Sequence, residues 1–190
     1  AAPDSGCQPL PDVPMPYAND QSLAPEDQPH SLNGMDYLQW SAYCDHNYFL
    51  PLAYDYEAIR WMQDSVQGSP VIVEAQSFDL YRMSSRYTWN TGLPDVVGWD
   101  WHERQQRALL PTQFIPERGV EVTNFYQDLD PAAASDFLKK YDVRYIVVGP
   151  MERAYYPADG LAKFEQLVLQ GVLSVAYHNP GVTIYEVQGP

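Results

Sequence analysis

Basic residues are scarce in this chain of 190 residues. It has 11 Lys and Arg against 25 Asp and Glu, which gives a formal net charge of −14. Only three of the basic residues are lysines: Lys139, Lys140 and Lys163. Nucleic acids and anionic membrane surfaces are bound through basic patches, so this composition argues against them as partners. Arginine carries most of the positive charge, as is typical where cations make forked, planar contacts.

Long apolar runs and the common catalytic motifs are also missing. No apolar run approaches the length of a transmembrane helix. The start, Ala1-Ala2-Pro3-Asp4, lacks the charged and apolar regions of a signal peptide, which leaves a cytosolic protein or a piece of a larger one. There is no Gly-x-Ser-x-Gly motif, no P-loop, and no Gly-x-Gly-x-x-Gly after a predicted strand. Nucleotide binding and nucleophilic hydrolysis therefore have no support, and we expect no cofactor.

Only two cysteines are present, Cys7 and Cys44. They are either two unrelated thiols or one disulfide, and a disulfide requires an oxidising compartment. We favour the disulfide, because Cys7 lies in a Pro-rich stretch, residues 1–33, that is predicted to be an extended arm with little else to hold it. Neither the spacing nor the neighbours of the two cysteines indicate a zinc site.

Residues 34–190 have the patterns of a single α/β domain, and an apolar fraction of 45% is ordinary for a globular protein. Spacing and capping residues predict helices at 55–66, 102–110, 131–141 and 161–169. Short β-branched or alternating runs predict strands at 71–75, 120–126, 143–149, 173–177 and 182–187. Asp55 and Asp130 are expected to cap their helices. Residues 32–52 are expected to be irregular with a short helical turn, and residues 151–158 to form a turn.

Strands that alternate with helices indicate βαβ units with right-handed crossovers. The predicted fold is therefore a three-layer α/β sandwich with a mostly parallel, mixed sheet, which ends in an antiparallel C-terminal hairpin around His178-Asn179-Pro180-Gly181. Ligands of such sheets lie beyond the carboxyl ends of the strands. Four segments follow predicted strands and are expected to converge on one edge: Glu74, the long connection of residues 77–101, residues 126–128 and residues 149–153.

The segment after Gly98 is unusually rich in aromatic and charged side chains. Six residues are predicted to form a ligand-binding surface: Trp99, Asp100, Trp101, His102, Arg104 and Arg107. Aromatic faces next to charged forks bind polar, ring-shaped partners. In a strand-like segment Trp99 and Trp101 would form one platform; the alternative is that both bury the loop on its own domain. Asp100, His102 and Glu103 supply too few ligands for a metal, so no metal site is predicted.

Glu74 ends a predicted buried strand, and two roles are open for its carboxylate. With Asp79 or Asp100 it would form the acid pair of a glycosidase, which needs carboxylates about 5 to 10 Å apart. With Arg82 or Arg86 it would form a buried fork whose charge-assisted hydrogen bonds order the long connection. We favour the second role, in which Glu74, Arg82 and Arg86 support the ligand-binding surface.

Several motifs along the chain resemble those of one known family. They are residues 32–37 (Leu-Asn-Gly-Met-Asp-Tyr), 55–61 (Asp-Tyr-Glu-Ala-Ile-Arg-Trp), 68–75 (Gly-Ser-Pro-Val-Ile-Val-Glu-Ala), 91–94 (Thr-Gly-Leu-Pro), 98–102 (Gly-Trp-Asp-Trp-His), 105–107 (Gln-Gln-Arg) and 141–149 (Tyr-Asp-Val-Arg-Tyr-Ile-Val-Val-Gly). The series resembles the extracytoplasmic C-terminal part of the "YYY" membrane protein family, large polytopic proteins of bacteria and archaea of the GT-C glycosyltransferase type. The resemblance covers most of residues 32–187, and the Trp-Asp-Trp-His stretch with Gln-Gln-Arg is its most specific part.

The resemblance implies many transmembrane helices upstream of Ala1 and a lipid-phosphate-linked sugar donor for the parent protein. The catalytic acid of GT-C enzymes lies in a membrane-proximal loop near the N-terminal end of the protein, outside this chain. The tyrosine run that names the family is also absent, and Tyr155-Tyr156-Pro157 does not reproduce it. No catalytic residue is therefore carried over to this chain.

Three functions remain as hypotheses. The first is an extracytoplasmic domain of a GT-C-like integral membrane protein, which recognises an acceptor glycan or peptide, or caps the membrane-embedded site, without catalysis of its own. Its partners would be the transmembrane portion of the same protein and a glycan or lipid-linked sugar. The second is a stand-alone carbohydrate hydrolase that uses Glu74 and Asp100. The third is a purely structural interaction domain.

Overall fold

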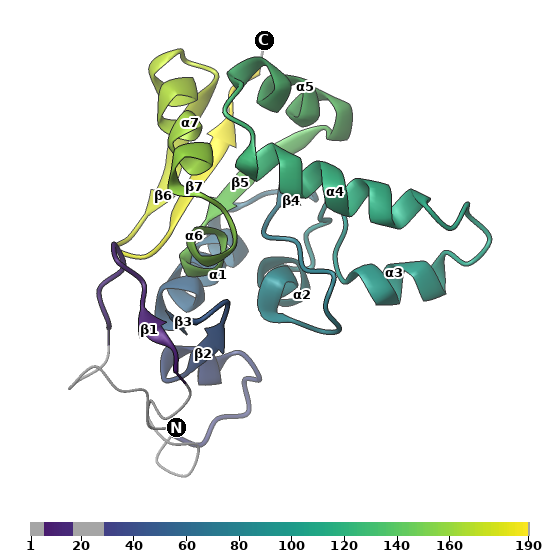
Figure 1. Ribbon diagram of the computed structural model, residues 1–190. Helices are drawn as coiled ribbons and strands as arrows, with labels where there is room; N and C mark the ends of the chain where they lie inside the picture. Colours follow the sequence, from purple (N-terminus) through teal and green to yellow (C-terminus); the bar gives the residue numbers. More distant parts are fainter. Residues whose placement is uncertain (1–5, 17–28, 190) are drawn as a thin grey trace.

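The computed structural model describes residues 6–16 and 29–189 of the chain. Its larger sheet has four strands in the order β4-β5-β7-β6, and a smaller sheet has three in the order β1-β3-β2 (Figure 1). The larger sheet consists of β4 (Val71–Val73), β5 (Val143–Val148), β6 (Leu173–His178) and β7 (Thr183–Val187). The smaller sheet consists of β1 (Gln8–Pro9), β2 (Ala42–Asp45) and β3 (Tyr48–Pro51).

Seven α-helices and two short 3-10 helices surround these sheets in the described part of the chain. The α-helices are α1 (Ala53–Ser65), α2 (Arg86–Thr91), α3 (Asp100–Gln106), α4 (Phe114–Gln127), α5 (Pro131–Tyr141), α6 (Pro150–Tyr155) and α7 (Ala158–Leu169). The 3-10 helices are η3 (Asp36–Gln39) and η4 (Met83–Ser85). Among the described residues, none of these helices has the length and apolar character needed to cross a bilayer.

Helices cover both faces of the larger sheet, so the fold has the three layers that the sequence predicts. On one face, Trp61 of α1 packs against Tyr145 of β5 and Tyr177 of β6, with ring centroids 6.3 and 5.4 Å apart. On the other face, Phe164 of α7 packs against Tyr185 of β7, which pairs in register with Ile146. Because neighbouring residues of a strand point to opposite faces, Tyr145 and Ile146 assign α1 and α7 to different layers.

The sheet is mixed, and its C-terminal hairpin of β6 and β7 is antiparallel, as predicted. The pairing of β4 with β5 is parallel, whereas β5 with β7 is antiparallel. The parallel share is thus smaller than a mostly parallel sheet would have. The reason is that the predicted strand at 120–126 is not a strand.

Residues 120–126 belong to helix α4, which corrects the strand predicted there. The local alternation of Val120, Glu121 and Val122 suggested a strand. The helical pattern extends over a longer stretch than this alternation and determines the structure. Its buried residues recur at spacings of three and four, and they are Ile115, Gly119, Val122, Phe125 and Tyr126. The helix therefore buries a stripe of side chains that cannot be recognised from residues 120–126 alone.

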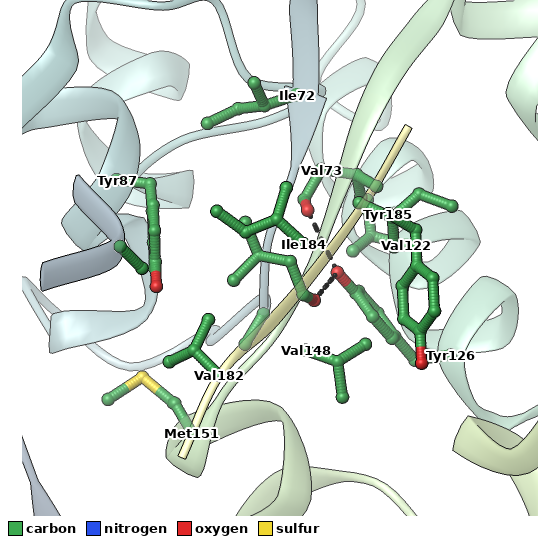
Figure 2. Close-up of a cluster of buried hydrophobic side chains, with 14 of the residues drawn as sticks. Ile72, Val73, Tyr87, Val122, Tyr126, Val148, Met151, Val182, Ile184 and Tyr185 are labelled. Carbon is green, nitrogen blue, oxygen red and sulfur yellow. Dashed lines mark hydrogen bonds between the residues drawn. The ribbon is translucent and has the colours of Figure 1, made fainter. Parts of the chain in front are cut away.

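Tyr126 connects this helix to the centre of the sheet (Figure 2). Its hydroxyl donates to the carbonyl oxygens of Val73 in β4 and Val147 in β5, at 3.0 and 2.8 Å. Its ring stacks on Tyr156, with centroids 4.6 Å apart. A buried hydroxyl requires partners, and these carbonyls lie near the ends of the two parallel strands. Helix α4 is thereby held over the β4–β5 pair.

The N-terminal region was predicted to be irregular, but residues 42–51 form a hairpin of β2 and β3. Its two-residue turn consists of His46 and Asn47, which both have positive φ, as a type I′ turn requires. The predicted helical turn is present as η3. The predicted arm of residues 1–33 lies partly outside the described residues, and its described part supplies β1, which pairs with β3.

Other differences concern short helices and caps. Asp130 caps α5 as predicted, with Pro131 at the first helical position. Asp55 does not cap α1, because the helix begins at Ala53 and the Asp55 carboxylate is buried against Arg86. The turn predicted at 151–158 contains helix α6, where Glu152 accepts a hydrogen bond from the Gly149 backbone N–H.

Candidate functional site

A buried ionic cluster anchors the long connection of residues 77–101 to the rest of the domain. At its centre is Arg86, the first residue of α2, whose side chain is 0% exposed. Its guanidinium lies 2.8 Å from Asp55 of α1, 3.7 Å from Glu74 beyond β4, and 2.8 Å from Glu152 of α6. Four segments that are distant in sequence therefore meet at one cation.

Glu74 is buried against the start of α2, and its role in support of a ligand-binding surface stays a prediction. Its carboxylate accepts hydrogen bonds from the backbone N–H groups of Tyr87 and Thr88, at 2.9 and 2.8 Å. These groups belong to the first turn of α2, where free N–H groups favour a negative charge. Of the two arginines predicted as partners, Arg86 lies beside Glu74, whereas Arg82 contacts Asp79 and Tyr43 instead.

The carboxyl groups around Arg86 differ in their pKa. Burial raises the pKa of Asp55, and burial together with the charge of Asp95 raises the pKa of Glu74. Burial acts on Glu152 as well, but Arg86 and two backbone N–H groups bring the pKa of that carboxyl below its usual value. Of the three carboxyl groups, Glu152 therefore ionises most readily beside Arg86.

Asp95 organises the turn that leads to the Trp-rich segment. Its two carboxylate oxygens accept from the N–H groups of Val96 and Gly98, at 2.7 and 3.0 Å. Burial raises the pKa of Asp95 to about 7, although these hydrogen bonds favour its ionised form. Residue 95 also bridges to Ile72 of β4, so the turn is attached to the edge of the sheet.

Trp99 lies in a half-buried aromatic cluster. Its ring meets Tyr81 and Trp89 edge-on, with centroids 5.2 and 4.7 Å apart. Its indole N–H donates to the carbonyl oxygen of Arg82 at 2.9 Å. Trp89 and Tyr81 keep 37% and 54% of their surface exposed, so the cluster presents aromatic faces to solvent.

A pocket of about 290 Å³ opens beside this cluster. Polar groups on its wall come from η4, α2, α3 and α4 and from the segments between them. They are Ser85, Thr88, Asp95, His102, Glu103, Arg107 and Arg118. Trp89 and Trp99 supply the aromatic part of the wall. The hydroxyl of Ser85 is buried and has no hydrogen-bond partner among the described residues. A small, partly aromatic pocket with several polar groups is typical of a binding site for a polar ligand.

The predicted ligand-binding residues occupy three kinds of place. Trp99, His102 and Arg107 line the pocket. Trp101 is 48% exposed on α3. The third kind is an ion pair of Asp100, 4% exposed, with Arg104 at 2.6 Å. Because α3 begins at Asp100, Trp99 and Trp101 do not lie on a strand and do not form the predicted shared platform. Trp99 instead packs with Trp89 and Tyr81.

The disulfide favoured from sequence is formed. Cys7 and Cys44 are bonded, with Cα atoms 6.1 Å apart. The two cysteines are 37 positions apart in the sequence. The bond ties the segment that contains β1 to the hairpin of β2 and β3. In the described part of the chain, no group of three or more His, Cys, Asp or Glu side chains is arranged to hold a metal ion.

Comparisons with known proteins find similarity only among solved structures. No family model matches the chain, and no curated protein matches it. The fold comparison finds a crystal structure of the C-terminal globular domain of oligosaccharyltransferase from Archaeoglobus fulgidus, with 15% identity and a TM-score of 0.42 over 70% of this chain and 95% of that chain. A second crystal structure of that domain has 16% identity and a TM-score of 0.38 over 70% and 94%. TM-scores of this size establish neither a shared fold nor a shared function.

Several residues of the site carry little or no signal in the sequence. Asp55 and Glu152 join the ionic cluster from segments far from Arg86, and no local pattern marks them. Trp89 and Arg118 line the pocket but are not among the residues predicted for the site. The sequence does give a signal for Trp89, which lies three residues after Arg86. Like Trp99, it belongs to a segment rich in aromatic residues.

Proposed function

We propose that this chain is an extracytoplasmic domain of a GT-C-like integral membrane protein. In this proposal the surface around Trp99 recognises a glycan or another acceptor group, or covers the membrane-embedded site of the same protein. The domain supplies recognition, and the transmembrane portion of the parent supplies any chemistry.

The observation that carries this proposal is the concentration of exposed apolar side chains in the part of the sequence that contains Trp99. Eight of the 13 large hydrophobic residues that are exposed in the described part of the chain lie between residues 78 and 120. They are Phe78, Leu80, Tyr81, Trp89, Trp101, Leu109, Leu110 and Val120. Exposed apolar patches with polar residues among them are typical of interaction sites, and aromatic rings are suited to the apolar faces of sugars.

Two further features support the proposal, one for the location and one for the kind of partner. The Cys7–Cys44 disulfide fits an oxidising compartment. The net charge of −14 disfavours direct binding to anionic lipid, so contact with a membrane protein or a neutral glycan is more compatible with the surface. The resemblance of several sequence motifs to those of the YYY family supplies the membrane context of the proposal.

The hydrolase alternative loses its support. Its two carboxylates are both bound to arginines, Glu74 to Arg86 and Asp100 to Arg104. Glu74 is also 1% exposed and accepts two backbone hydrogen bonds, so it has no access to a substrate. A glycosidase requires two carboxyl groups on opposite sides of a sugar.

The test is glycan binding by the 190-residue chain on an array, followed by titration of the best ligand. Trp101→Ala and His102→Ala remove exposed side chains of the proposed surface, and each is expected to weaken binding at least tenfold with an unchanged melting temperature. Tyr37→Ala is the matched control, because Tyr37 is similarly exposed at 42% but lies outside the residue range of the patch. This control should bind as the wild type does.

Two results would contradict glycan recognition. One is the absence of binding to any glycan, and the other is an equal loss of affinity in the Tyr37→Ala control. If no glycan binds but Trp101→Ala disrupts assembly with the transmembrane portion in the full-length protein, the covering role is supported instead. An unchanged assembly in that variant would remove both roles.

A further inference from the structure

A second and larger cavity, of about 710 Å³, lies at the carboxyl end of β5, away from the Trp99 pocket. Its floor includes Val148, the last residue of β5, and Thr183, the first of β7. Helices α6 and α7 form one wall. Residues 10–12 of the N-terminal segment form another. Cavities of about 300 to 1,000 Å³ accommodate small molecules, and open α/β sheets bind ligands beyond the carboxyl ends of their strands.

Arg153 is the one guanidinium of this cavity. Among the described residues its side chain forms no hydrogen bond or ion pair, and its charge acts on the nearby Tyr185 hydroxyl. Arg153 lies half-buried on α6, and its Nε atom is buried without a hydrogen bond. The other seven arginines of the chain each form an ion pair or hydrogen bond, and they are Arg60, Arg82, Arg86, Arg104, Arg107, Arg118 and Arg144.

The absence of a partner is unexpected in so acidic a protein. The chain has 25 acidic residues for its 11 basic ones, so carboxylates are plentiful. Two of them, Asp12 and Glu165, line the same cavity, yet neither forms an ion pair with Arg153 in the described structure. Glu165 accepts a hydrogen bond from the Tyr185 hydroxyl instead. A buried donor without a partner destabilises a fold, so its presence calls for a functional reason.

The remaining walls define what else a ligand would contact. Phenol rings of Tyr48, Tyr155 and Tyr185 line the cavity together with Leu161. Tyr155 is held in place, since its hydroxyl donates to Asp45 at 2.6 Å and its ring packs on His46. These walls suit a ring or another apolar body. The arginine suits the oxygens of a carboxylate or phosphate, which it binds through two parallel N–H groups.

We propose that this cavity is a binding site for a small ligand that carries an oxyanion, a carboxylate or a phosphate, next to a ring-shaped or apolar body. Arg153 binds the oxyanion, and the tyrosines contact the body. The segment of residues 10–12 closes the site, and it is held by the pairing of β1 with β3 and by the Cys7–Cys44 disulfide. This site does not depend on the function proposed for the Trp99 surface.

The experiment measures binding of benzoate and phenyl phosphate to the oxidised chain by calorimetry, with phenol as the neutral probe and ionic strength held constant with sodium chloride. At least one of the two oxyanions is expected to bind more than tenfold tighter than phenol. Arg153→Gln should lower that affinity at least tenfold, and Arg153→Lys should retain part of it, because the charge remains while the fork is lost. Arg144→Gln is the control on an exposed arginine and should leave the affinity unchanged.

The melting temperature of the free protein separates this role from a structural one. Since the Arg153 side chain has no hydrogen bond or ion pair to lose among the described residues, Arg153→Gln should melt at or above the wild-type temperature. A decrease of several degrees would identify Arg153 as a structural residue and overturn the proposal. Equal affinity for phenol and both oxyanions, or unchanged oxyanion binding in Arg153→Gln, would overturn it as well.

Discussion

Arg86 and Glu152 form a two-pronged ion pair that is closed off from solvent. Their nitrogen and oxygen atoms are 2.8 and 3.2 Å apart, and both side chains are 0% exposed. The two residues are separated by 66 positions, and the pair joins the start of α2 to α6. Because Gly149 and Ala75 also donate to Glu152, this pair holds together the ends of the two parallel strands.

Replacement of Arg86 should therefore be among the most damaging single changes in the chain. Arg86→Met leaves the carboxyl groups of Asp55, Glu74 and Glu152 buried without their cation, which is expected to cost about 3 to 5 kcal/mol of unfolding free energy. The measurement is urea denaturation of the purified chain. Arg144→Met is the control, because Arg144 pairs with Glu186 on the surface, and its loss should cost about 1 kcal/mol or less. Similar losses in the two variants would show that the buried cluster is not a centre of stability.

The stability of the protein should decrease as the pH rises from about 4 to about 7, to the extent that Asp95 controls it. Burial raises the pKa of this carboxyl to about 7 in the folded chain, whereas an unfolded chain has the ordinary value near 4. Between these values the folded state binds more protons than the unfolded state, so the free energy of unfolding falls with rising pH. The raised pKa of Glu74 acts in the same direction, and the lowered pKa of Glu152 acts in the opposite one.

Asp95→Asn isolates this contribution. Urea denaturation of both proteins at pH values from about 4 to about 8 should give a difference in unfolding free energy that changes across the window and is flat above about pH 7. The unfolding free energy of the variant is expected to increase relative to that of the wild type as the pH rises. A difference that is independent of pH would mean that Asp95 titrates at the same pH in the folded and unfolded states.

Local patterns predicted much of this fold. Asp130-Pro131 marks the start of α5, the β-branched run of β5 ends at Gly149, and Asn179-Pro180-Gly181 marks the C-terminal turn, and each of these signals operates over a few neighbouring residues. Helix α4 was missed because a seven-residue window showed alternation while its buried stripe extends over 12 residues, from Ile115 to Tyr126. The β2–β3 hairpin was missed because its turn residues, His46 and Asn47, give a weaker signal than Asn-Gly.

The site was predictable only in part, for a related reason. The sequence left two partners for Glu74, Arg82 and Arg86, because both lie in the connection that follows it, and the structure places Arg86 beside it. Asp55 of α1 and Glu152 of α6 reach Arg86 from distant parts of the sequence, and such long-range contacts depend on topology rather than on local spacing. The same dependence explains why the partner of Trp99 is Trp89 and not Trp101.

The two tryptophans of the Trp-Asp-Trp motif should differ in their effect on stability. Trp99 makes two ring contacts and donates a hydrogen bond to Arg82, so Trp99→Ala is expected to cost about 2 kcal/mol or more. Trp101 is 48% exposed, and Trp101→Ala should stay within about 0.5 kcal/mol of the wild type. Thermal and urea unfolding of both variants check this order. The reverse order would mean that α3 packs through Trp101 and that the exposed ring is not free to bind a ligand.

Gly149 provides a direct test of how rigid the ionic cluster is. A Cβ atom at this position would lie 2.9 Å from Arg86 Nη2, 3.1 Å from Asp55 Oδ1 and 3.3 Å from Glu152 Oε2. These groups are bound to one another and are fully buried, so they have little room to move aside. Gly149→Ala is expected to cost about 1 to 3 kcal/mol, as other overpacked sites do.

Gly34→Ala is the matched control, because no atom lies within 4 Å of its added Cβ. At such a position the restricted unfolded chain favours the variant, so its stability should be unchanged or slightly higher. Unfolding by urea compares the two, and the pH dependence of Gly149→Ala adds a second readout. If the added methyl separates Arg86 from Glu152, the pKa of Glu152 rises toward its ordinary value. The variant should then lose stability mainly at pH values above the ordinary pKa of a glutamate. A variant that is as stable as the wild type would mean that the carboxylates rearrange around Arg86 without cost.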